Sequence, residues 1–166
     1  MPNIRHIRPC LWFDHQAEEA ARYYVAIFGG SSRITQVTRY TEAGFEIHGR
    51  PAGSVMVATF ELQGHKFIAM NGGPVFKFNE AVSLAVACDT QQELDYFWDK
   101  LSAGGDPQAQ QCGWLKDKYG LSWQIVPAMM DELMADDTSK KGERVMNAML
   151  QMKKIDIAGL QRAAHR

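Results

Sequence analysis

The stretch FDHQAEEAARYYVAIFGG (residues 13–30) has a counterpart 75 positions later in CDTQQELDYFWDKLSAGG (residues 88–105). In both, an apolar run ends at an aspartate, a glutamine follows two residues later, a glutamate four residues later, and a glycine pair closes the segment. Asp14 and Asp89 each stand where a helix N-cap is expected, and glycine commonly ends helices because it adopts left-handed backbone conformations without a Cβ clash. The constant offset indicates an internal duplication.

Strand patterns surround each of the two predicted helices. In the first half they are residues 4–13, SSRITQVTRY (31–40), SVMVATFEL (54–62) and HKFIAMN (65–71); in the second half they are AVSLAVAC (81–88), a short strand around QAQQ (108–111), CGWLKD (112–117) and LSWQIV (121–126). Both halves therefore read β-α-β-β-β. Repeats of this length cannot bury their apolar faces alone, so we expect the two halves to share an interior.

The predicted fold class is α+β, with two βαβββ modules and a C-terminal helical extension. The expected boundaries are residues 1–71 for the first module, 72–79 for a Gly- and Pro-rich linker, 80–126 for the second module and 127–166 for the C-terminal helices. Pro127 suits a first helical position, and Asp156 suits the N-cap of a last short helix.

The C-terminal segment is rich in methionine, with six of the nine methionines between Met129 and Met152. One stripe of a predicted helix contains Val145, Met146, Met149 and Leu150. Such stripes are usually packing surfaces, and this one could cover its own sheet or another subunit.

Charge and composition exclude several classes of partner. With 18 Lys and Arg against 19 Asp and Glu, the net charge of −1 offers no overall attraction to nucleic acid or anionic membranes. No apolar run approaches the roughly 20 residues that cross a bilayer, and MPNIRHIRPCLWF lacks the features of a signal peptide. We expect a cytoplasmic protein without nucleic-acid or membrane partners, in which Cys10, Cys88 and Cys112 remain free thiols.

Two βαβββ modules, an aspartate after the first strand and KDKYGLSWQI (116–125) resemble the vicinal-oxygen-chelate superfamily of glyoxalase I, extradiol dioxygenases, and bleomycin and fosfomycin resistance proteins. The closer resemblance is to its PhnB-like branch, often labelled 3-demethylubiquinone-9 3-methyltransferase-like. It is carried by LWFDHQAEEAARYY (11–24), IAMNGGP (68–74), CGWLKDKYGLSWQIVP (112–127) and ERVMNAMLQMKKIDIAGL (143–160). The superfamily resemblance covers residues 4–127, and the closer match extends into the C-terminal segment. The resemblance implies two sheets curled into a cup, helices outside, and a homodimer.

In metal-using members of the superfamily, the ligands are His, Gln or Glu on the first and last strand of each module. Here Gln124 occupies the usual Glu position, residues 67–70 contain no ligand, and the first-strand positions fall on Ile7, beside His6, and on Val82. Metal sites need several donors that converge on one point. We therefore expect no metal site and no other cofactor. The alternative is a divalent-metal lyase, isomerase or dioxygenase that uses Gln124, His6 and a third ligand.

Other chemistries find little support in the sequence. Methyl transfer from S-adenosylmethionine usually employs a Gly-rich turn after a parallel strand, whereas these glycine pairs end helices or join the modules, so the methyltransferase label is discounted. No sequence pattern places a histidine against Cys112, and Glu61, on an alternating strand, is expected to face water.

What remains is a binding cup with apolar walls and a few polar groups, which suits a small, partly apolar organic ligand. The residues expected to contact the ligand are Leu11, Phe13, Met70, Trp114, Ser122 and Gln124. The alternative interpretation is that these side chains fill the interior. The leading hypothesis is a metal-independent protein that binds or sequesters a small molecule.

Overall fold

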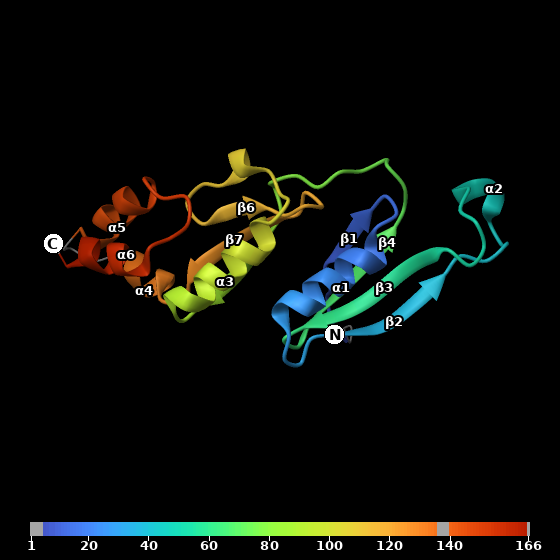
Figure 1. Ribbon diagram of the computed structural model, residues 1–166, viewed down its shortest axis with the longest axis horizontal. Coiled ribbons are helices and arrows are strands. Elements are labelled where there is room, and N and C mark those ends of the chain that lie inside the picture. The colour runs from blue at the N-terminus through green and yellow to red at the C-terminus, as the bar shows by residue number, and fades with distance from the viewer. Residues whose placement is uncertain (1–4, 136–139, 166) are drawn as a thin grey trace, which may run out of the picture. The chain divides into compact units, whose positions relative to one another are not determined.

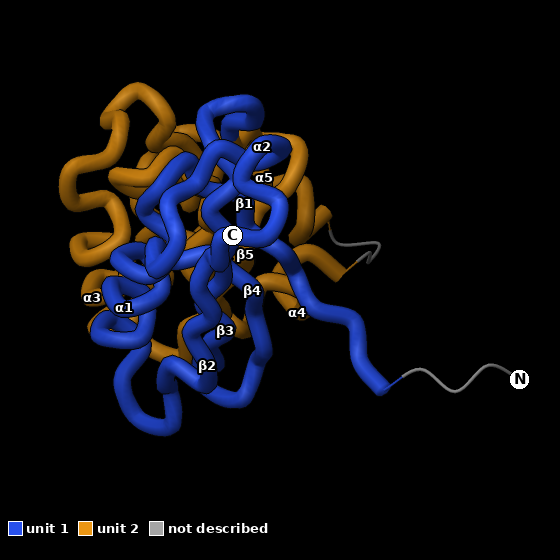
Figure 2. Tube along the Cα trace, turned by 90° about the vertical axis from the view of Figure 1, so that its right-hand side faces the viewer, with its two compact units in different colours: residues 1–77 blue, residues 78–166 orange. Residues whose placement is uncertain are grey.

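The computed structural model describes residues 5–135 and 140–165. Its elements are β1 (Cys10–Phe13), α1 (Ala17–Phe28), β2 (Arg33–Arg39), α2 (Phe45–His48), β3 (Val55–Leu62), β4 (His65–Asn71), β5 (Ser83–Cys88), α3 (Gln91–Ser102), η1 (Pro107–Ala109), β6 (Trp114–Lys116), β7 (Ser122–Pro127), α4 (Met130–Met134), α5 (Lys141–Met149) and α6 (Ile157–Ala164) (Figure 1). The predicted α+β fold with C-terminal helices is confirmed. The chain divides into two compact units, residues 1–77 and 78–166 (Figure 2).

The first unit is a four-stranded sheet with α1 packed on one face (Figure 1). The strand order is β1-β4-β3-β2, with β1 parallel to β4 and the other pairs antiparallel. Tyr24 of α1 is buried and stacks on Phe60 with ring centroids 6.2 Å apart, and Phe60 stacks on Phe67 at 5.2 Å. Because side chains alternate along a strand, this aromatic contact defines the helix-covered face of the sheet.

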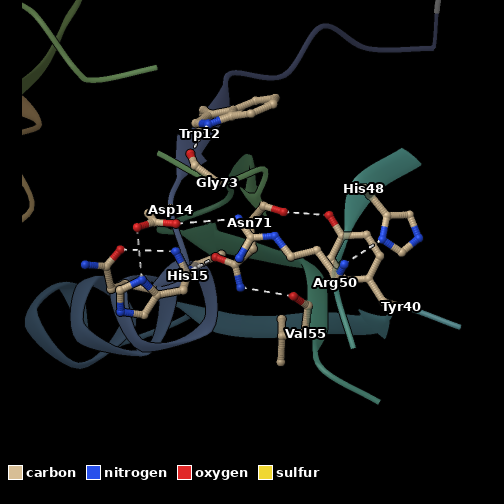
Figure 3. Close-up of polar contacts among 11 residues, drawn as sticks. Trp12, Asp14, His15, Tyr40, His48, Arg50, Val55, Asn71 and Gly73 are labelled. Carbon is tan, nitrogen blue, oxygen red and sulfur yellow. Dashed lines mark hydrogen bonds and ion pairs between the residues drawn. The ribbon is translucent and has the colours of Figure 1, made fainter. Parts of the chain in front are cut away.

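Helix α1 is capped from another strand. The prediction that Asp14 caps it is wrong, because the N-cap residue is Gln16 and makes no side-chain capping bond. Instead, Asn71 at the end of β4 accepts a hydrogen bond from the Ala17 N–H at 2.8 Å and donates to the Val55 carbonyl at 3.0 Å (Figure 3). One buried amide therefore joins the helix start to two neighbouring strands.

The start of the predicted linker packs on the first unit. Trp12 donates through its indole N–H to the Gly73 carbonyl at 2.8 Å (Figure 3), and its ring meets that of Phe76 edge-on at 5.0 Å. A Cβ atom at Gly72 would overlap the Trp12 ring. Gly72 is thus required for the close approach of the chain to Trp12.

The second unit contains a three-stranded sheet, ordered β5-β7-β6, with α3 alongside it (Figure 1). Leu94, Trp98 and Leu101 of α3 are buried, as are Trp123 and Ile125 of β7. Alternation along β7 assigns the Trp123 and Ile125 side chains to the face that packs on α3.

The cap of α3 also differs from the prediction. Its N-cap is Thr90 rather than Asp89, and Thr90 forms a capping box with Glu93. The Thr90 hydroxyl accepts from the Glu93 N–H at 3.2 Å, and the Glu93 carboxylate accepts from the Thr90 N–H at 3.1 Å. The T-x-x-E pattern was present in the sequence, and its reciprocal bonds satisfy two free helix N–H groups.

Four other local predictions need correction. The short strand expected at residues 108–111 is the 3-10 helix η1, where Pro107 cannot donate to a strand ladder and Asp106 accepts from the Gln108 N–H at 2.9 Å. Of the strand expected over residues 4–13, only Cys10–Phe13 forms a strand, β1, among the described residues. The loop between β2 and β3 contains α2, and Pro127 ends β7 instead of opening a helix.

The C-terminal segment belongs to the second unit. Gln91 of α3 donates to the Ile155 carbonyl at 3.0 Å and accepts from the Ile157 N–H at 2.9 Å, so it holds the chain just before α6. Val145 is buried, whereas Met146 and Leu150 are 36% and 50% exposed. The methionine-rich stripe therefore packs only in part on its own unit. No helix in the described residues has the length and apolar character needed to cross a membrane.

Replacing Asn71 by alanine should lower the free energy of unfolding by about 2–4 kcal/mol, because a buried N–H and a buried carbonyl lose their partners. Urea denaturation followed by circular dichroism measures the change. The matched control is Asn147→Ala on the exposed side of α5, which should change stability by less than about 0.5 kcal/mol. Equal effects of the two substitutions would contradict the capping role of Asn71.

Candidate functional site

The predicted ligand contacts of the first unit lie on opposite faces of its sheet. Leu11 and Phe13 are 6% and 4% exposed, and the register pairs Leu11 with Ala69, on the face covered by α1. Met70 pairs with Trp12 on the other face. We call the face opposite α1 the far face of the first sheet. The structure places Leu11 and Phe13 in the helix-packed core, separate from Met70.

The predicted contacts of the second unit share one face. Trp114 pairs with Gln124 across β6 and β7, and Ser122 lies two residues from Gln124 on the same side, opposite the α3-packed face. The Gln124 side chain donates to the Ser83 hydroxyl at 2.8 Å. The Ser122 hydroxyl is buried and has no hydrogen-bond partner among the described residues. The structure thus brings Trp114, Ser122 and Gln124 together.

The positions at which metal-using relatives would place ligands do not form a donor set. Ile7 and Val82 are apolar and strongly exposed, and the Gln124 amide is engaged with Ser83. The described residues contain no group of three or more His, Cys, Asp or Glu that could hold a metal ion. The side chains present therefore do not fit a divalent-ion site of the usual kind.

A pocket of about 210 Å³ lies along the far face of the first sheet. Its polar lining comprises His6, Arg8, Thr35, Gln36, Thr59 and Lys66, together with Glu61. Strand alternation cannot place both Thr35 and Gln36 at one pocket. A bulge does so here, because the β2–β3 register passes directly from Ile34 to Gln36 and leaves Thr35 as the extra residue.

Glu61 is a buried member of an ion-pair cluster, so the expectation that it faces water is wrong. It is 8% exposed, and its carboxylate lies 2.6 Å from the Arg33 guanidinium and 3.8 Å from the Lys66 ammonium. Arg33 pairs directly with Glu61 across β2 and β3, while Lys66 pairs with it across β3 and β4. The nearer Arg33 therefore balances its charge, and Lys66 adds a second positive charge beside it.

Sequence reasoning missed most of this pocket. The alternation of Thr59 with the buried Ala58 and Phe60 could have assigned Thr59 to the far face. Arg8 lies before β1, outside any regular strand, and the bulge at Thr35 leaves no sequence signal.

The cysteines are not arranged as activated nucleophiles. Burial raises the pKa of the Cys88 thiol to about 11, and the nearby carboxylates Glu93 and Asp89 act in the same direction. Burial also raises the pKa of Cys10, against an opposing effect of Arg8. The Cys112 sulfur accepts a hydrogen bond from the Gln111 side chain at 3.5 Å.

Comparison with known proteins gives a family match over most of the chain. A family model described as 3-demethylubiquinone-9 3-methyltransferase matches residues 5–126. The putative 3-demethylubiquinone-9 3-methyltransferase, PhnB protein, from Bacillus cereus is 34% identical and aligns over 74% of this chain and 99% of its own, with a TM-score of 0.62. No curated protein matches the chain.

More distant solved structures were also found. Protein PA1353 from Pseudomonas aeruginosa is 21% identical over 74% of this chain and 96% of its own, with a TM-score of 0.52. The fosfomycin resistance protein FosX from Listeria monocytogenes is 13% identical over 84% of this chain and 96% of its own, with a TM-score of 0.45.

Cys88 should resist alkylation in the folded protein. A thiol with a pKa of about 11 is ionised in only about one molecule in a thousand at pH 8, and the side chain is also buried. We expect iodoacetamide at pH 8 to modify the exposed Cys10 first and Cys88 only after denaturation, as measured by peptide mass spectrometry. Modification of native Cys88 as fast as Cys10 would contradict this.

Proposed function

Because the chain belongs to the 3-demethylubiquinone-9 3-methyltransferase family, within the glyoxalase and bleomycin-resistance superfamily, we propose that it binds a small organic molecule without a resident metal ion. The observation that carries this proposal is the pocket on the far face of the first sheet, opposite α1. Pockets with a few convergent polar groups are how proteins usually hold small ligands.

The second unit has its own group of proposed ligand contacts. Trp114 offers an aromatic ring beside Gln124, and the buried Ser122 hydroxyl has an unused hydrogen-bonding capacity. Trp114, Ser122 and Gln124 are the proposed ligand contacts of the second unit, and Met70 is a separate proposed contact on the far face of the first sheet. Leu11 and Phe13 act instead as packing residues beneath α1.

Metal independence rests on the chemistry of the side chains. A divalent ion needs several donors, and anionic ligands help to offset its dehydration. Glu61 is the buried carboxylate of the pocket, and Arg33, at 2.6 Å, already balances its charge. One observation favours the alternative of a metal-dependent lyase, isomerase or dioxygenase, namely that His6 lines the same pocket as Glu61.

Methyl transfer is not part of the proposal, since methyltransferase here is only the name of the family. The N–H of Gly29 bonds the Val25 carbonyl at 3.0 Å and closes α1, and Gly72 makes room for the Trp12 ring. The glycine pairs at residues 29–30 and 72–73 thus have structural roles, and neither fits a cradle for the nucleotide part of S-adenosylmethionine.

Thermal unfolding against a panel of small organic acids, amides and aromatic compounds tests the proposal. A true ligand at one hundred times its dissociation constant should stabilise the protein by about 2.7 kcal/mol. The stabilisation should survive prior treatment with EDTA, and S-adenosylmethionine in the same panel should produce no shift.

The control for this experiment is metal analysis of protein purified without chelator or metal-affinity chromatography. A panel without any hit would reject the binding proposal. A stoichiometric divalent ion, whose removal abolishes ligand binding, would favour the metal-dependent alternative.

The proposal includes self-association as a homodimer, which the family resemblance supports. Light scattering after size exclusion should give a mass near twice that of the 166-residue chain. A mass equal to that of one chain, unchanged over a hundredfold range of concentration, would reject the dimer.

A further inference from the structure

We propose that the pocket on the far face of the first sheet selects ligands that carry an oxyanion, such as a carboxylate or phosphate group. This inference rests on the proposed binding function and assigns it a chemical class. It draws on the charge balance of the pocket, its hydroxyl groups and the bulge that places them.

The pocket carries an excess of positive charge. Arg33 lies 2.6 Å from Glu61 and balances its carboxylate, whereas Lys66 is more distant at 3.8 Å and is half exposed. Within the described residues, Arg8 has no carboxylate partner. Arg8 and Lys66 therefore provide cationic donors that the sheet does not need for its own charge balance.

The threonine hydroxyl groups that line the pocket provide a further hydrogen-bond donor. The hydroxyl oxygens of Thr35 and Thr59 lie 2.8 Å apart and form a mutual hydrogen bond. Only one hydroxyl proton is used in this bond, because the accepting hydroxyl keeps its own proton. That second O–H can donate to a ligand oxygen.

This set of donors matches an oxyanion better than a neutral group. A guanidinium presents N–H donors in a plane that fits the two oxygens of a carboxylate or phosphate, and charge-assisted bonds are roughly twice as strong as neutral ones. A neutral ligand would leave the Arg8 charge without a counter-charge. Because Lys66 is partly exposed, the attraction should weaken as salt screens it.

The bulge makes the donor arrangement specific to this site. It leaves Thr35 as the extra residue beside Gln36, so that both line the pocket opposite Thr59. Bulges often re-aim a side chain next to a binding site. The hydroxyl pair therefore depends on this irregularity of β2.

Titration of the isotope-labelled full-length chain with inorganic phosphate at low ionic strength, followed by two-dimensional NMR, tests this inference. We expect amide shifts confined to residues 6–8, 35–36, 59–61 and 66. Arg8→Gln should weaken phosphate binding at least about fivefold, as expected for the loss of one charge-assisted contact. Lys66→Gln should also weaken it, and Thr59→Val should do so to a smaller extent.

The matched control is Lys77→Gln, which removes one positive charge from an exposed position outside the pocket and should change the affinity less than twofold. Melting temperatures establish that each variant is folded. A parallel titration with succinate tests the carboxylate arm, and localised binding of either anion supports the inference.

Absence of localised shifts with both anions, or equal weakening by Arg8→Gln and Lys77→Gln, would overturn the oxyanion inference. Neutral hits in the thermal panel would then leave the broader binding function intact. A panel without hits would reject the binding function itself.

Discussion

The stacking of Tyr24 on Phe60, which in turn stacks on Phe67, is the contact on which the organisation of the first unit depends. Side chains alternate along a strand, so a large aromatic group fixed against α1 assigns every neighbouring position to one face or the other. Burial of Phe60 places Thr59 and Glu61 on the far face. The packing of Phe60 against α1 therefore determines both the hydrophobic core and the residues that line the pocket.

The duplicated sequence pattern produces similar helices held by different interactions. At α3, Thr90 and Glu93 form a local capping box, whereas α1 depends on Asn71, more than fifty residues away in sequence. A local cap can act as soon as the helix forms, but a distant cap requires the sheet to be in place. The start of α1 is thus tied to sheet assembly in a way that α3 is not.

The same difference between local and distant interactions explains which features could be predicted from the sequence. The spacing of apolar residues and the glycines at helix ends predicted both long helices and the long strands, because those signals are local. The sequence could not show that Asn71 replaces Asp14 as the cap, nor that Arg33 and Lys66 would flank Glu61, since both depend on strand register. Predicting Leu11 and Met70 on one surface failed for the same reason.

The family name and the side chains support different levels of conclusion. Membership fixes the scaffold, and a shared scaffold can carry unrelated chemistries. The chemistry depends on three local facts. The Gln124 side chain is hydrogen-bonded to Ser83, Arg33 balances Glu61 within the sheet, and Arg8 has no carboxylate partner in the part of the chain that the structure describes. When the carboxylates are already neutralised and cations are left in excess, a pocket attracts anions more readily than metal ions. The electrostatic character of this pocket therefore follows from which charges the sheet has already paired.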